Sequence, residues 1–269
     1  MMGSQVNIGG TWKDINGVYV NVGGAWKTAS SMRCNIGGTW KDGWSSIGGI
    51  DAYTKLMLHM NGTNDSTTFT DSSLSPKTVT ANGNVCIKTA EKVFGSGSAY
   101  FDGTGDYLSL ADSDDWSLGI NDFTVDCWIK REIVGVSTTI CMQIDSALST
   151  GSTSFGLSIL STNVVQGQIN SGTTSYLVQS VSTITDNSWH HLALVRNGNT
   201  LCLFIDGVLS GSRDITGLAV NDSPNPLVIG KLGDYAGYYW NGYIDEFRVS
   251  KGIARWTADF TPPTQEYSA

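Results

Sequence analysis

The segment Trp189–Gly207, which reads WHHLALVRNGNTLCLFIDG, constrains the fold more than any other part of the chain. Two apolar runs flank Asn197-Gly198-Asn199, and Gly and Asn accept the left-handed backbone of a tight reversal, so the segment predicts a β-hairpin. Both faces of each run are largely apolar, whereas a hairpin at the protein surface would have one polar face. We therefore predict a hairpin that is covered on both faces, as in the middle of a sandwich.

The rest of the chain after residue 53 repeats this type of pattern. Short β-prone runs follow one another, separated by turn residues, and no long segment has the apolar spacing of a helix. Glycine accounts for 32 of the 269 residues, which suits many tight turns. Such a series predicts an all-β, two-sheet antiparallel sandwich or jelly roll.

The N-terminal region contains a threefold repeat. Units that begin at Val6, Val20 and Cys34 share the pattern Asn-[Ile/Val]-Gly-Gly-[Thr/Ala]-Trp-Lys. A diglycine between two short β-prone runs predicts a small hairpin, which cannot bury its own tryptophan. Two interpretations stay open: a small β-meander whose tryptophans form a mini-core, or a docking and oligomerisation module.

The composition bears on the class of partner. The chain carries a net charge of -8, and an acidic chain without a basic cluster is a poor candidate for nucleic-acid binding.

Five widely spaced cysteines without a C-x-x-C pair predict reduced thiols. No signal peptide and no apolar run long enough to insert into a membrane are evident, so we expect synthesis in a cytosol.

Five blocks of the chain together resemble the laminin-G-like, concanavalin A-like lectin jelly-roll family. In chain order these blocks read LMLHMNGTNDSTTFTDSS, AYFDGTGDYLSL, FTVDCWIKR, WHHLALVRNGNTLCLFIDG and YWNGYIDEFRVSKGIARW. The resemblance covers about residues 53–263 and implies a concanavalin A-like two-sheet jelly roll. The predicted organisation is a repeat module at 1–47, a linker at 48–52, the jelly roll at 53–263 and a tail at 264–269.

The FDGTGDYL block and the GIARWTADFTPP ending are most similar to copies of this domain in bacteriophage structural proteins. The N-terminal repeats also resemble Gly-Gly-x-Trp-Lys units of phage tail-fibre proteins. The resemblance implies a virion protein at a phage tail or capsid surface, synthesised in the bacterial cytoplasm and joined to other virion proteins through the repeats. A homo-oligomer is expected, for which a trimer is one option.

Carbohydrate binding is the leading functional hypothesis. Sugars present flat C–H faces that stack on aromatic rings, while carboxylates and amides bond their hydroxyls. The predicted carbohydrate-binding residues come from an aromatic loop and from one strand: Tyr235, Tyr238, Tyr239, Trp240, Trp128 and Asp126. The alternative is a capsid or tail decoration protein without a glycan ligand.

The resemblance also implies a structural Ca²⁺ ion at the edge of the sandwich. Asp102 and Asp245 match recurrent acidic positions of the family, and Asn61 is placed to contribute a carbonyl oxygen. Oxygen ligands of this kind are those that Ca²⁺ prefers.

A glycoside hydrolase is the less favoured alternative, and we predict a protein that is not an enzyme. Laminarinase-type hydrolases of this fold carry Glu-x-Asp-x-x-Glu on one strand, and none of the four glutamates here stands in that pattern. No nucleophile motif such as G-x-S-x-G accompanies the three histidines.

Overall fold

The computed structural model describes six short strands within residues 5–45 and then residues 49–144, 153–232 and 237–268. The chain divides into two compact units, Met1–Gly49 with Tyr267–Ala269, and Ile50–Glu266. Within the described residues, no helix is long and apolar enough to cross a membrane.

The first unit contains three two-stranded antiparallel sheets. Their strands are β1 (Gln5–Ile8) with β2 (Thr11–Asp14), β3 (Tyr19–Val22) with β4 (Ala25–Thr28), and β5 (Ser31–Ile36) with β6 (Thr39–Ser45). The diglycine of each repeat separates the two strands of one pair, so the hairpin prediction is confirmed. The tryptophan side chains lie outside the described residues, and both interpretations of the module stay predictions.

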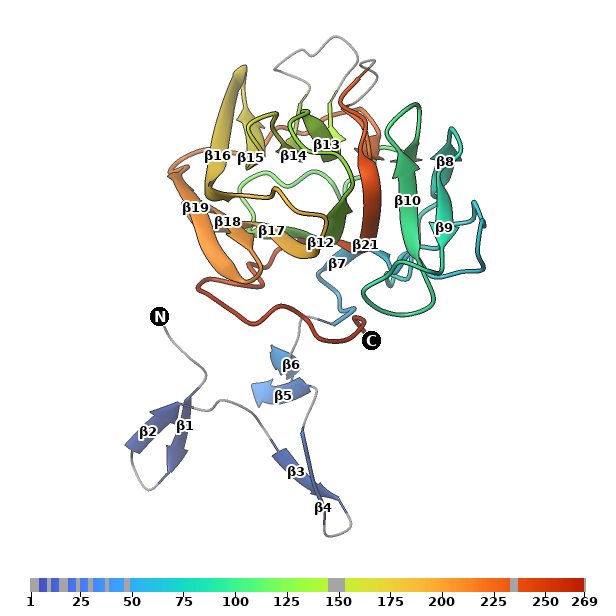
Figure 1. The fold of residues 1–269 in the computed structure, drawn as a ribbon. Helices are drawn as coiled ribbons and strands as arrows, with labels where there is room; N and C mark the ends of the chain where they lie inside the picture. Colours follow the sequence, from blue (N-terminus) through green and yellow to red (C-terminus); the bar gives the residue numbers. More distant parts are fainter. Residues whose placement is uncertain are drawn as a thin grey trace. The chain divides into compact units, whose positions relative to one another are not determined.

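The second unit is a sandwich of two antiparallel sheets (Figure 1). The larger sheet has the order β19-β18-β17-β12-β21-β10-β9, and β7 pairs with β21 as an eighth strand. Its strands are β7 (Thr54–Leu58), β9 (Cys86–Lys88), β10 (Ser98–Asp102), β12 (Phe123–Arg131), β17 (Trp189–Asn197), β18 (Thr200–Ile205), β19 (Val208–Asp214) and β21 (Asn241–Lys251).

The smaller sheet has seven strands in the order β16-β15-β14-β13-β20-β11-β8. They are β8 (Thr80–Asn82), β11 (Tyr107–Leu110), β13 (Thr138–Gln143), β14 (Phe155–Ile159), β15 (Val164–Ser171), β16 (Thr174–Thr183) and β20 (Leu227–Ile229). Side chains of both inner faces fill one core, to which Phe123 of the larger sheet and Phe155 of the smaller sheet each contribute a fully buried ring. The predicted all-β jelly-roll sandwich is confirmed.

The hairpin of β17 and β18 is covered on both faces, as its sequence predicts. Asn197 pairs with Thr200 across the turn, and Gly198 takes a φ of 58°, which suits glycine. Leu192 and Leu194 face the core between the sheets. On the outer face, Ala193, Val195, Cys202 and Phe204 form a second apolar cluster under Ala254, Trp256 and Phe260.

The segment after β21 therefore covers part of the outer face of the larger sheet. The rings of Trp256 and Phe260 stack on each other at a centroid distance of 4.1 Å, and Phe260 also contacts Phe204. We call residues 252–260 the C-terminal cover.

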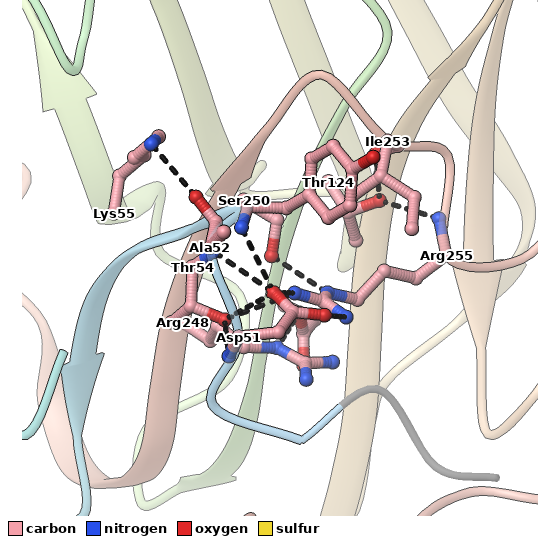
Figure 2. A network of polar contacts seen from close by, with 11 residues as sticks. Asp51, Ala52, Thr54, Lys55, Thr124, Arg248, Ser250, Ile253 and Arg255 are labelled. Atoms are coloured by element: carbon pink, nitrogen blue, oxygen red, sulfur yellow. Dashed lines mark hydrogen bonds and ion pairs between the residues drawn. The ribbon is translucent and has the colours of Figure 1, made fainter. Parts of the chain in front are cut away.

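A buried polar network joins the C-terminal cover to the sheet (Figure 2). Arg255 binds Asp51 through both terminal nitrogens, at 3.1 and 2.8 Å, and its backbone N–H donates to Thr124 Oγ1. Arg248 lies beside it and donates to both carboxylate oxygens of Asp126, at 3.0 and 3.2 Å. The network ties the first and last segments of the domain to its central strands.

Asp126 and Arg248 are both fully buried. Burial by itself would raise the pKa of Asp126, but its interactions with Arg248 and His191 together outweigh that effect and hold the pKa at about 2. The carboxylate is therefore charged at neutral pH and compensates the guanidinium.

We expect Asp126→Asn to lower the free energy of unfolding by about 3–5 kcal/mol, because it leaves the Arg248 charge buried without a countercharge. Urea denaturation measures the loss. The double variant Asp126→Asn/Arg248→Met is the control and should be more stable than Asp126→Asn alone. A loss below about 1 kcal/mol for Asp126→Asn would mean that the pair behaves like an exposed ion pair.

Candidate functional site

Four neighbouring strands of the larger sheet bring Tyr100, Tyr243, Lys130 and Trp189 into one row. The strand register pairs Tyr100 with Tyr243, Tyr243 with Lys130, and Lys130 with Trp189. All four side chains are partly exposed. Because the flanking residues Phe101, Ile244 and Ile129 face the core, alternation directs the row to the outer face. We call these four residues the aromatic row.

The ring of Tyr243 contacts the other two rings of the aromatic row across the strands. The ring centroids of Tyr100 and Tyr243 lie 4.9 Å apart, and those of Trp189 and Tyr243 lie 6.3 Å apart. The ammonium of Lys130 lies 5.9 Å from the centroid of the Tyr243 ring. Rings held by neighbours on a rigid sheet form a preorganised apolar platform.

Carboxylates lie beside this platform. Glu91 Oε2 is 2.6 Å from Lys130 Nζ. Burial raises the pKa of the Tyr100 hydroxyl, and the nearby charge of Glu132, which accepts a hydrogen bond from that hydroxyl, raises it further. The surface thus combines flat apolar faces with hydrogen-bond donors and acceptors, the combination that a sugar ring requires.

The adjacent row of side chains on the same outer face, which contains Trp128, is covered by other side chains. Trp128 pairs with Asp245 on β21 and with His191 on β17, and both partners are fully buried. The rings of Phe94 and His191 contact Trp128 at centroid distances of 6.0 and 5.3 Å. The aromatic row therefore lies between this closed row and the rim of the sandwich.

The predicted carbohydrate-binding residues occupy different environments. Tyr238 has 45% of its surface exposed, and Tyr239 and Trp128 are partly exposed. Trp240 lies in the core between the sheets, and Asp126 is buried against Arg248. Tyr235 lies outside the described residues. The structure thus leaves Tyr238 and Tyr239 with surface for a ligand, whereas Trp128 lies in the closed row between Phe94 and His191. Trp240 and Asp126 are enclosed by packing.

Sequence reasoning missed the aromatic row, although alternation carries part of the signal. Trp128 and Lys130 lie on the same face of β12, so the outward direction of Lys130 follows from the prediction for Trp128. The alignment of Tyr100, Tyr243 and Trp189 with Lys130 depends on the register between strands that are distant in sequence. That register is not evident in any single strand.

The three predicted calcium ligands do not share one point. Asp102 pairs with Asn241, and Asp245 lies four residues further along β21, a separation of about 13 Å along the strand. Asp102 Oδ1 accepts hydrogen bonds from the backbone and hydroxyl of Thr104. The side chain of Asn61 is hydrogen-bonded to Ser96 and Glu266.

Asp245 is held by backbone donors. Its Oδ2 accepts from the N–H groups of Val93 and Phe94, at 2.8 and 3.2 Å. Burial is the main cause that raises the pKa of Asp245 to about 7. A calcium site at Asp102, Asp245 and Asn61 stays a prediction.

His190, next to Trp189, is held between two carboxylates. Its Nδ1 lies 2.7 Å from Asp206 and its Nε2 lies 2.8 Å from Asp186. The hydrogen bond to Asp206 is the largest cause that raises the pKa of His190 from 6.5 to about 9, and Asp186 adds to it, while partial burial opposes the rise.

This arrangement predicts a pH dependence of stability. Because the folded pKa lies above the unfolded one, the stabilisation is complete below about pH 6.5 and is lost as the pH rises through about 9. We expect a loss on the order of 1 kcal/mol, since both carboxylates are largely exposed to solvent. Urea denaturation at pH 6 and pH 10 should show this loss for the natural chain and not for His190→Gln. Equal losses in the two proteins would contradict the assignment.

Comparisons with known proteins agree with the two-sheet fold. The family model described as the concanavalin A-like lectin/glucanases superfamily matches residues 102–255, more than half of the chain. A search of curated proteins found no match.

Solved structures with the same fold include bacterial toxin binding domains. The binding domain of Paraclostridial Mosquitocidal Protein 1 superposes with a TM-score of 0.60 at 15% identity, covering 76% of this chain and 50% of that one. The receptor binding domain of botulinum neurotoxin D gives 0.57 at 18% identity, with 76% and 50% covered. The binding domain of botulinum neurotoxin DC in complex with SialylT gives 0.55 at 14% identity, with 76% and 49% covered.

The match thus spans about half the length of each of these structures, and at such identities the likeness shows the fold alone. The match to the family model and the two-sheet sandwich agree. The chain belongs to the concanavalin A-like lectin/glucanases superfamily.

Proposed function

We propose that the domain of residues 50–266 is a lectin that binds cell-surface carbohydrate on the aromatic row. The observation that carries this proposal is the contiguous set of partly exposed rings, Tyr100, Tyr243 and Trp189, on one rigid sheet face. A sugar ring stacks its C–H face on such a platform. Lys130 within the row and Glu91 and Glu132 beside it supply hydrogen-bonding groups for the hydroxyls.

The comparison structures add support of a general kind. All three are binding domains by description, and the one from botulinum neurotoxin DC is in complex with SialylT. These descriptions refer to the whole of each structure, and the present chain matches about half of its length. The ligand of the present chain is proposed from its own surface.

We propose further that the domain is not an enzyme. The adjacent carboxylates Asp245 and Glu246 are almost fully buried, and Asp245 is bonded to backbone N–H groups. A glycosidase needs two carboxylates that flank a bound sugar. The burial of this pair supports a binding role over hydrolysis.

For the whole chain we propose a phage virion protein, at a tail or capsid surface, with host-surface glycan as its ligand. The three hairpins of the first unit would join it to other virion proteins and to copies of itself. The alternative is a decoration protein without a glycan ligand. A chain that binds virus particles and never adsorbs to host cells would favour the alternative, and adsorption to host cells would favour the lectin.

We expect Tyr243→Ala and Trp189→Ala each to weaken glycan binding by about tenfold or more, because each removes a stacking surface. A glycan array identifies the ligand, and isothermal titration calorimetry with that ligand measures the loss. Tyr238→Ala tests the predicted aromatic loop in the same assay. If Tyr238→Ala abolishes binding and the two row variants do not, the loop is the site and the row is not.

Tyr53→Ala provides a matched control. Tyr53 is an exposed tyrosine beside a hollow of about 390 Å³ that Lys251 and Asn121 also line. Lys251 ends β21, whereas Tyr243 lies near the beginning of the same strand, so Tyr53 is at the opposite end of the sandwich. Binding should be unchanged in Tyr53→Ala. A loss in this variant alone would place the ligand in the hollow instead of on the aromatic row.

A further inference from the structure

Strand β21 changes its neighbour halfway along its length. Its first half pairs with β10, where Ile244 lies opposite Ala99, and its second half pairs with β7, where Phe247 lies opposite Leu58. The register of β21 against β12 shifts at the same place. Glu246 lies at this irregularity with a φ of 49°, so its side chain leaves the regular alternation of the strand.

Three side chains from distant parts of the chain converge there. His59 follows β7, Glu246 lies within β21 and Glu266 ends the second unit. His59 Nδ1 lies 2.7 Å from Glu246 Oε1 and 4.0 Å from Glu266 Oε1. The nitrogen and the two carboxylate oxygens all lie within 4.8 Å of one another.

The position of Glu266 is fixed by groups around it. The amide of Asn61 donates to Glu266 Oε1, and the Oδ1 of Asn61 accepts from the backbone N–H of Ser96. A Cβ at Gly95 would overlap both the Asn61 amide and the Glu266 carboxylate. Glycine at this position therefore leaves the space that Glu266 needs to reach His59. Outer hydrogen bonds of this kind orient the ligands of metal sites.

We propose that His59, Glu246 and Glu266 bind a divalent transition-metal ion of the zinc type. One imidazole nitrogen and two carboxylates form a ligand set that Zn²⁺ accepts, whereas Ca²⁺ and Mg²⁺ prefer oxygen ligands alone. Glu246 is only 1% exposed, and Glu266 is 38% exposed, so the ion would enter from the Glu266 side. The proposal does not depend on the glycan ligand.

His190 shows why this geometry matters. It also has two carboxylates within hydrogen-bond distance, but Asp206 lies at Nδ1 and Asp186 lies at Nε2, on opposite sides of the ring. One ion cannot reach both carboxylates and a ring nitrogen there. At His59 both glutamates face the same nitrogen, so the three ligands surround one point.

The experiment uses the full chain after treatment with a chelator and its removal. Calorimetric titration with ZnCl₂ measures affinity and stoichiometry, and the absorption of the Co²⁺-loaded chain reports the type of ligand. We expect one ion per chain, with a Co²⁺ spectrum that lacks a thiolate charge-transfer band. His59→Gln and Glu266→Gln should each lose more than about 100-fold in affinity, and Asn61→Ala about tenfold.

His190→Gln is the matched control and should bind Zn²⁺ as the natural chain does. Circular dichroism and the melting temperature without metal show whether each variant is folded, and Glu266→Gln changes a partly exposed side chain that is compatible with folding. Unchanged Zn²⁺ affinity in folded His59→Gln and Glu266→Gln would overturn the proposal. So would a thiolate band in the Co²⁺ spectrum, or binding of CaCl₂ in place of ZnCl₂.

Discussion

The structure depends on the burial of both faces of the central strands of the larger sheet. One face of β12, β17, β18 and β21 packs on the smaller sheet, and on β17 and β18 the other face carries Ala193, Val195 and Phe204, which are as apolar as the core. Such a sheet must be covered on its outer face too, since exposed apolar area of this size favours association. The C-terminal cover meets this requirement through Trp256 and Phe260.

Two arginines lie where the cover meets the sheet. Arg248 of β21 lies under the cover and Arg255 is part of it, and Asp126 and Asp51 compensate their charges within hydrogen-bond distance. Removing one partner of such an ion pair strongly destabilises the folded protein, so each arginine must lie beside its own aspartate. This requirement fixes where the cover lies on the sheet. The outer face is thus divided into a closed part under the cover and Phe94, and an open part that presents the aromatic row.

The two proposed sites follow from two different features of β21. Its regular first half presents Tyr243 between Tyr100 and Lys130, where neighbouring strands align side chains. Its irregular middle turns Glu246 toward His59 and Glu266. The same strand therefore contributes a surface suited to a sugar ring and a cluster suited to a metal ion, and the superfamily fold supports either kind of site.

The sequence by itself determined the fold class, the hairpin of β17 and β18, and the strand pairs of the N-terminal repeats. Alternation and turn residues are local properties, and they are sufficient for these features. Alternation also placed Trp128 and Asp126 correctly on the outer face of β12. It did not reveal that this part of the face is closed, because the covering side chains, such as Phe94 at Trp128 and Arg248 at Asp126, come from distant parts of the chain.

Only the tertiary structure decided which residues are open to a ligand and which carboxylates meet a histidine. The aromatic row forms only because four strands pair in one particular register. The cluster at His59 forms where the pairing partner of β21 changes from β10 to β7. The register of the strands and the change of pairing partner along β21 are set by the packing of the whole sandwich, so no local sequence pattern encodes them.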